Sequence, residues 1–252
     1  MRKSPVVLFV FIFCCRSISA QVTGDDNRWM LSVTPIAAKF IMAAKSYSAI
    51  PFSGNNFGVG SSFSYQSRNL LQELRGVYGS GKLSAEDNPS ATSKQTYYDI
   101  SYTALFQIAP GNSSSFMYRA GGSINFLSAK RTYTGFINRD LSSESASSFS
   151  AALDISYLFK EADLKLVDRL TIPLVTYISQ SEPGNGGKDK VRNKVVAIPS
   201  FLRVRNSFSL EKSLADHHSL ALVYTWDYYR IKGFHEVKQA SHQLGLSYCY
   251  IF

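Results

Sequence analysis

The stretch 116–126, FMYRAGGSINF, alternates between two kinds of side chain. One set of alternate positions is apolar or small and comprises Phe116, Tyr118, Ala120, Gly122, Ile124 and Phe126. The positions between them are polar or small and include Arg119, Gly121, Ser123 and Asn125. Because successive side chains of a β-strand point to opposite faces, this alternation predicts a strand with one apolar and one polar face.

The same pattern recurs along most of the chain. We expect ten strands, near 28–42, 55–66, 70–79, 97–109, 115–128, 148–160, 164–178, 196–210, 219–231 and 241–252. Alternation is weak at 70–79, 164–178 and 196–210. In the first strand, the apolar parity set by Trp29, Leu31 and Val33 switches around Pro35, which predicts a bulge or an edge.

The connections between these segments alternate in length. Short ones fall at 67–69, 110–114, 161–163 and 211–218, and longer ones at 43–54, 80–96, 129–146, 179–195 and 231–240. Short turns at one end and longer loops at the other are typical of an outer-membrane barrel. The sequence therefore predicts an all-β fold, a transmembrane antiparallel up-and-down β-barrel of ten strands, with eight or twelve strands as alternatives.

The N-terminal segment has the features of a secretory signal peptide. Arg2 and Lys3 precede an apolar run over 6–15, and small residues follow up to Ala20. We expect residues 1–20 to be a cleaved signal peptide and residues 21–252 to form the barrel. Cleavage would leave Cys249 as the one cysteine, so no intramolecular disulfide is expected.

A soluble lipocalin-like or sandwich domain is the alternative fold, with the apolar face as its core. Two observations favour the membrane barrel. The polar faces carry Gly, Ser and Thr more than Lys and Glu, which suits a confined interior. The apolar strips carry Tyr or Phe toward their ends, as with Phe57 and Tyr65, which is typical of girdles at the two membrane interfaces.

The last strand places His242, Leu244, Leu246, Tyr248, Tyr250 and Phe252 on one face, and Phe252 is the final residue. This strand resembles the terminal strand of Gram-negative bacterial outer-membrane β-barrel proteins. The resemblance implies that Tyr248, Tyr250 and Phe252 belong to a signal for the barrel assembly machinery. It also implies a location in the outer membrane.

If the apolar faces contact lipid, the opposite parity points into the lumen. The charged residues of that parity are Glu73, Arg75, Asp99, Arg119, Asp154, Arg203, Arg205 and Asp227, four acids and four arginines. Unpaired charges in a narrow interior are costly, so we expect these side chains to pair. Two hypotheses follow: a filled barrel stiffened by ion pairs, or a narrow polar channel for passive, porin-like transport. Ten strands favour the filled or narrow form.

Two further functions remain open. The long loops at 80–96, 129–146 and 179–195 could make the protein a surface binder or adhesin. A hydrolase, omptin-like or acting on lipid A, would need a base beside a nucleophile or water. Of the four histidines, His217 and His218 fall in a turn, His242 has lipid-facing parity, and His235 lies in a loop beside Glu236. We therefore expect no catalytic residues, no metal site and no cofactor.

Basic residues crowd the loop 179–195, namely Lys188, Lys190, Arg192 and Lys194, and Lys130 and Arg131 lie at the base of the preceding one. At the outer surface their expected partners are lipopolysaccharide phosphates. A solvated, flexible loop is the alternative. Outer-membrane lipid is the other expected partner, and nucleic acid is not expected.

Overall fold

The structure is a computed structural model that describes residues 27–44, 51–88, 90–108, 115–134, 141–182, 190–232 and 236–252. The predicted signal peptide, residues 1–20, lies outside these ranges. The described chain consists almost wholly of strands: β1 (Arg28–Ala44), β2 (Phe52–Gln66), β3 (Leu70–Ala85), β4 (Thr92–Gln107), β5 (Phe116–Thr134), β6 (Leu141–Phe159), β7 (Leu164–Glu182), β8 (Lys190–Ala197), β9 (Phe201–Ala215), β10 (His218–Lys232) and β11 (Glu236–Ile251). Within these ranges, no helix is both long and apolar enough to span a membrane.

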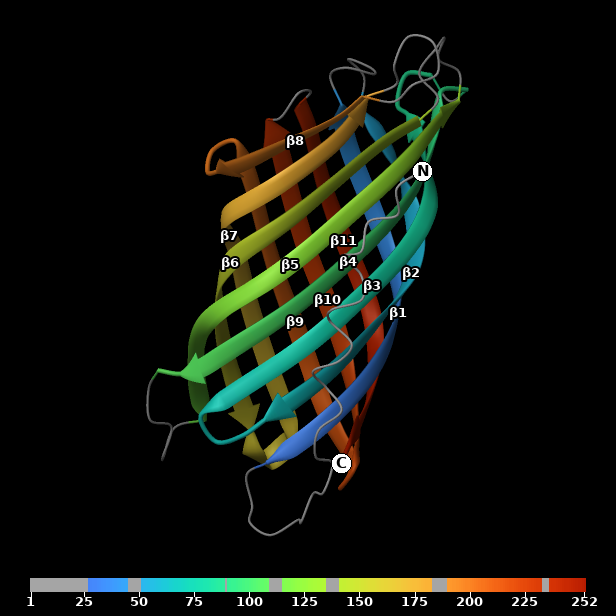
Figure 1. Ribbon diagram of the computed structural model, residues 1–252. Helices are drawn as coiled ribbons and strands as arrows, with labels where there is room; N and C mark the ends of the chain where they lie inside the picture. Colours follow the sequence, from blue (N-terminus) through green and yellow to red (C-terminus); the bar gives the residue numbers. More distant parts are fainter. Residues whose placement is uncertain are drawn as a thin grey trace.

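Ten of these strands close into an antiparallel barrel (Figure 1). Neighbours in sequence pair from β1 to β7, then β7 pairs with β9, β9 with β10, and β10 with β11. The barrel closes where β11 pairs with β1, from Met30 opposite Ile251 to Ala44 opposite Val237. The predicted fold class and the count of ten barrel strands are confirmed, with β8 as an additional strand.

The outward face of the wall is apolar and exposed. On β5, for example, Ile124 is 62% exposed while the neighbouring Ser123 is 2% exposed. Aromatic side chains gather near the turn end of this face, where Trp29 stacks on Phe63 at 5.0 Å and Phe116 contacts Tyr157 at 4.5 Å. A second group lies nearer the other end, where Tyr78 contacts Tyr98. Two aromatic bands that flank an apolar belt are typical of a transmembrane barrel.

The bulge or edge predicted at Pro35 is wrong. β1 keeps one parity along its length, with Trp29, Leu31 and Val33 outward and Ile36, Phe40 and Met42 inward. Its register with β2 is continuous across Pro35. The apolar residues that follow Pro35 are therefore interior packing, which sequence alternation alone did not distinguish from a lipid-facing strip.

The strands extend farther than predicted at the end with the longer connections. β5 continues to Thr134 and β6 begins at Leu141, so most of the predicted loop 129–146 is strand. The segments 80–96 and 179–195 are likewise mostly β3, β4, β7 and β8. Strands of 15–19 residues rise about 50–65 Å along their own direction. They are thus longer than the apolar belt of about 25 Å requires, even when tilted.

β7 pairs with two different strands, β9 along one part of its length and β8 along the other. A register shift on β6 between Phe149 and Ser150 leaves Leu174 of β7 without an opposite residue, which is a β-bulge. On the turn side of the bulge β7 pairs with β9, up to Thr171 opposite Arg205. On the other side it pairs with β8, from Val175 opposite Ala197. The predicted strand 196–210 is therefore two strands, separated by a turn at 198–200.

Candidate functional site: the barrel interior

The structure places all eight predicted lumen residues inside the barrel, at two levels. The level nearer the turns borders a cavity of about 230 Å³. Around its mouth, at the turn ends of their strands, lie Met30, Lys165, Glu211 and Cys249. Deeper in, the lining includes Glu73, Arg75, Arg119, Asp154, Arg169 and Arg205.

Arg169 of β7 lies at the centre of the charged residues of this cavity. Its guanidinium donates to Glu73 across the barrel at 2.8 Å and to Asp154 on the neighbouring strand at 3.2 Å. Asp154 also lies 3.7 Å from Arg119, and both of those side chains are almost fully buried. These contacts connect β3, β5, β6 and β7 through one chain of opposite charges.

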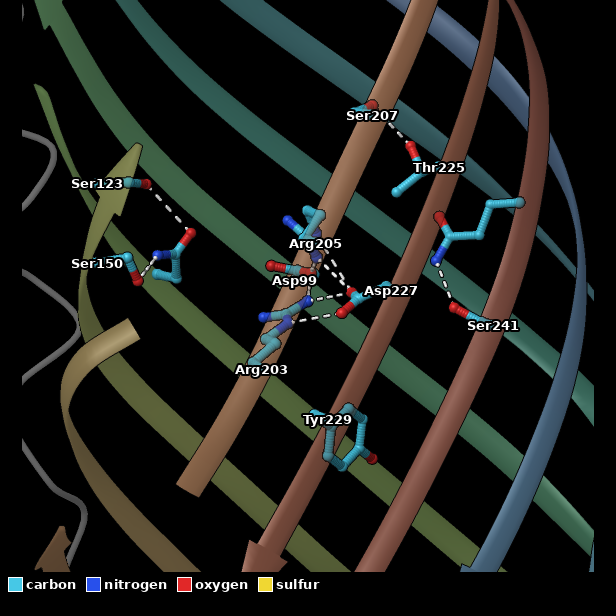
Figure 2. Close-up of polar contacts among 12 residues, drawn as sticks. Asp99, Ser123, Ser150, Arg203, Arg205, Ser207, Thr225, Asp227, Tyr229 and Ser241 are labelled. Carbon is cyan, nitrogen blue, oxygen red and sulfur yellow. Dashed lines mark hydrogen bonds and ion pairs between the residues drawn. The ribbon is translucent and has the colours of Figure 1, made fainter. Parts of the chain in front are cut away.

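Four charged residues form a second layer at the inner end of the cavity (Figure 2). Arg203 and Arg205 project from β9 and share Asp227 of β10, with donor–acceptor distances of 3.0 Å from Arg203 Nε and 3.0 Å from Arg205 Nη2. Both arginines also contact Asp99, which reaches them from β4. We call Asp99, Arg203, Arg205 and Asp227 the quartet. Guanidinium–carboxylate pairs with several hydrogen bonds offset the cost of burying these charges.

Arg75 differs from the other predicted lumen residues. It lines the cavity, yet within the described part of the chain it forms no hydrogen bond or ion pair. Arg205 and Arg169 repel its charge, and Glu73 and Asp227 attract it. Both of those carboxylates already accept hydrogen bonds from other arginines.

A third polar cluster lies beyond the quartet, toward the end with the longer connections. Arg131 of β5 pairs with Glu144 of β6 at 2.8 Å and donates to Tyr229 and Gln239 on the far side of the barrel. Gln239 also accepts a hydrogen bond from Gln95. Arg131 is 1% exposed, which corrects its predicted position at the base of a loop.

Apolar side chains fill the interior around this third cluster. One group packs Phe40, Met42, Phe52, Leu83 and Tyr97 together, and another joins Ile178, Val196, Phe201 and Ile231. Tyr97 lies over Gly79, where a Cβ would overlap the phenol ring. Between the quartet and this packing is a void of about 10 Å³, which is room for about one water molecule. The predicted polar lumen is thus polar at the turn end, and at the other end apolar packing surrounds the third polar cluster.

Sequence reasoning missed Arg169, Arg131 and Glu144. Arg169 lies on β7. The inward residues of this strand are odd-numbered before the bulge at Leu174 and even-numbered after it. Arg131 and Glu144 lie in the segment 129–146, which was predicted as a loop. Buried and exposed residues alternate through the described parts of this segment. A test for period-two alternation within the predicted loops could therefore have found both residues.

The other predicted site residues lie on the wall. Tyr248, Tyr250 and Phe252 face outward, and the Phe252 amide donates to the Trp29 carbonyl at the closure of the barrel. Their role in assembly stays a prediction. Arg192 and Lys194 are exposed on β8, whereas Lys188 and the side chain of Lys190 lie outside what the structure describes.

The three described histidines make ordinary contacts. His217 bonds to the Ile251 carbonyl, His218 to the Tyr248 hydroxyl and His242 to the Tyr224 hydroxyl. His235 lies outside the described residues. In the described ranges, no group of three or more His, Cys, Asp or Glu residues is arranged to hold a metal ion.

Similarity to known proteins comes from structure alone. No protein-family model matches the chain. No curated protein matches it either. Among solved structures, the outer membrane protease OmpT from Escherichia coli has 9% sequence identity and a TM-score of 0.57, over 91% of this chain and 98% of that one. The translocator domain of the autotransporter NalP from Neisseria meningitidis has 10% identity and a TM-score of 0.45, over 90% of each chain. The chain has the fold of an outer-membrane β-barrel.

Proposed function

We propose that this protein is an integral outer-membrane β-barrel with a structural role, sealed at its outer end and without a continuous channel. The observation that carries the proposal is the interior beyond the cavity. The polar cavity ends at the quartet, and the next void has room for about one water molecule. Of the two forms that the sequence left open, the filled barrel is therefore favoured over the narrow pore.

The location follows from the wall and the N-terminus. An apolar outward belt between two aromatic bands suits a lipid bilayer, in which a sheet must close to pair its backbone groups. The predicted signal peptide supports export. The short turns would then lie in the periplasm and the cavity would open there.

Surface binding and hydrolysis are less favoured. The strands take up most of the three segments that were predicted as long loops, which leaves less chain for an adhesive surface. The contacts of His217, His218 and His242 involve tyrosines and a backbone carbonyl rather than carboxylates. OmpT is a protease, and at 9% identity its likeness to this chain is one of fold alone.

Lysines on the outward face favour lipopolysaccharide as a partner. Lys82 of β3 lies opposite Lys94 of β4, and Lys130 of β5 lies opposite Thr96. All three lysines are exposed. Lys82 lies four residues after Tyr78, and Lys94 lies four residues before Tyr98. Both lysines are therefore about 13 Å along the strand from the tyrosine pair, away from the turn end. Cations just beyond an aromatic band are positioned for lipid phosphates.

Conductance tests the sealed interior. The wild-type protein in planar bilayers should give no discrete current steps, because the void between the quartet and the described packing has room for about one water molecule. The triple substitution Phe40→Ser, Arg131→Ser and Phe201→Ser removes large buried side chains from this packing and should produce steps. Resistance of the folded barrel to protease checks that both proteins are assembled. Discrete steps from the wild type would exclude the sealed form.

The quartet should contribute strongly to stability. Asp227→Asn leaves two buried arginines with Asp99 as their remaining carboxylate, and loss of one partner of a buried ion pair costs about 3–5 kcal/mol. The measurement is the free energy of unfolding by urea in lipid vesicles. Asp216→Asn, in an exposed turn, is the control and should change it by less than about 0.5 kcal/mol. Similar values for the two variants would contradict the proposed role of the quartet.

The outward lysines should govern affinity for lipopolysaccharide. Each lysine near an anionic lipid surface contributes about 1 kcal/mol, so Lys82→Gln, Lys94→Gln and Lys130→Gln together should weaken binding roughly 100-fold. Native mass spectrometry of the purified barrel with added lipopolysaccharide measures the affinity. The matched control replaces Arg28, Lys160 and Lys212 at the turn end with Gln. Equal losses in both triple variants would argue against a specific lipid contact.

A further inference from the structure

The charged side chains that line the cavity do not balance. Among the described residues that line it, five are basic, Arg75, Arg119, Lys165, Arg169 and Arg205, and three are acidic, Glu73, Asp154 and Glu211. The rest of the quartet adds Arg203, Asp99 and Asp227, which still leaves one positive charge in excess. The balance predicted from sequence, four acids against four arginines, omitted Arg169.

The excess charge is localised at Arg75. Glu73 is its nearest carboxylate in sequence but is engaged by Arg169 at 2.8 Å. Asp227 is engaged by both arginines of the quartet. Arg75 is therefore repelled by Arg169 and Arg205, and no carboxylate among the described residues pairs with it alone. Arg119 is a second arginine with unpaired donors. It is 2% exposed, and its Nε and Nη2 have no hydrogen-bond partner among the described residues.

We propose that the cavity binds a small oxyanion, a carboxylate or a phosphate, at Arg75. Such an anion would supply the missing negative charge and would lower the repulsion between Arg75, Arg169 and Arg205. A guanidinium presents a planar fork of N–H donors that matches the two oxygens of a carboxylate or phosphate. Ser62 and Ser101, which lie opposite Arg75 on β2 and β4 and also line the cavity, add hydroxyl groups beside it.

The cavity restricts the source and size of the anion. This step rests on the proposed function: if the outer end is sealed, the anion reaches Arg75 from the periplasmic side. A volume of about 230 Å³ is several times the 30 Å³ that a water molecule occupies in the liquid, so a small anion and a few water molecules fit together. The site faces the lumen rather than the lipid, which points to a free anion instead of a lipid headgroup.

Anion-dependent stability of the purified full-length barrel tests the proposal. The protein is held in maltoside micelles, which carry no phosphate, and its midpoint of thermal unfolding is measured by circular dichroism. Sodium phosphate, sodium acetate and sodium chloride are compared at constant ionic strength. Phosphate or acetate should raise the midpoint in proportion to the logarithm of its concentration above the dissociation constant, and chloride should not.

Three variants locate the site. Arg75→Gln should abolish the shift and, without added anion, should unfold at a higher temperature than the wild type because it removes the repulsion. Arg75→Lys keeps the charge but not the fork and should retain a smaller shift. Lys39→Gln removes one positive charge from the outward face of β1 and should behave as the wild type.

Phosphorus NMR provides a second measurement, because the inorganic phosphate signal should broaden with the wild type and not with Arg75→Gln. The proposal is overturned if neither oxyanion shifts the wild-type midpoint, or if Arg75→Gln keeps the full shift. Neither result depends on conductance. A barrel that conducts ions yet binds phosphate at Arg75 would contradict the sealed outer end and leave this site in place.

Discussion

The hydrogen bonds that close the sheet determine the rest of this structure. Backbone N–H and C=O groups have no water partners in the hydrocarbon of a bilayer, so a membrane-spanning sheet must pair its first and last strands. Here β1 and β11 meet along nearly their whole length. Once the sheet is closed, each strand has one face toward lipid and one toward a confined space. The apolar residues of one parity and the small or charged residues of the other are the consequence of that division.

The confined space is divided again along the barrel axis. Toward the turns, Ser, Gly and charged residues line a polar cavity. There an arginine on one side of the barrel pairs with a carboxylate on the other, as Arg169 does with Glu73. Beyond the quartet, aromatic and aliphatic side chains pack inward around the Arg131–Glu144 pair. This second region is packed like the core of a soluble protein. It is formed by the parts of the strands that continue past the length that the apolar belt needs. A barrel can therefore be lipid-facing outside and still hold an apolar core inside.

Alternation in the sequence was enough to predict the closed sheet, its ten strands and the inward position of residues such as Arg119, Asp154 and Asp227. These lie on β5, β6 and β10, where one parity holds from end to end. It failed where another effect interrupted or disguised the period. The bulge at Leu174 shifts the parity of β7 and concealed Arg169. Inward apolar residues after Pro35 resembled a change of face, and the strand ends that carry Arg131 and Glu144 resembled a loop. The pairing of particular charges across the barrel depends on three-dimensional neighbours that no local pattern contains. The same holds for the lack of a partner for Arg75 among the described residues.

Site-directed spin labelling in lipid vesicles tests the orientation of the two faces most directly. Single cysteines at 123, 124, 125 and 126 of β5, introduced into a Cys249→Ser background, carry a nitroxide whose accessibility to oxygen and to a water-soluble nickel chelate is measured. Labels at Ile124 and Phe126 should be accessible to oxygen, which concentrates in the bilayer, and should be protected from nickel. Labels at Ser123 and Asn125 should be protected from oxygen. Reversal of this alternation, or its absence along the strand, would contradict a barrel whose apolar face contacts lipid.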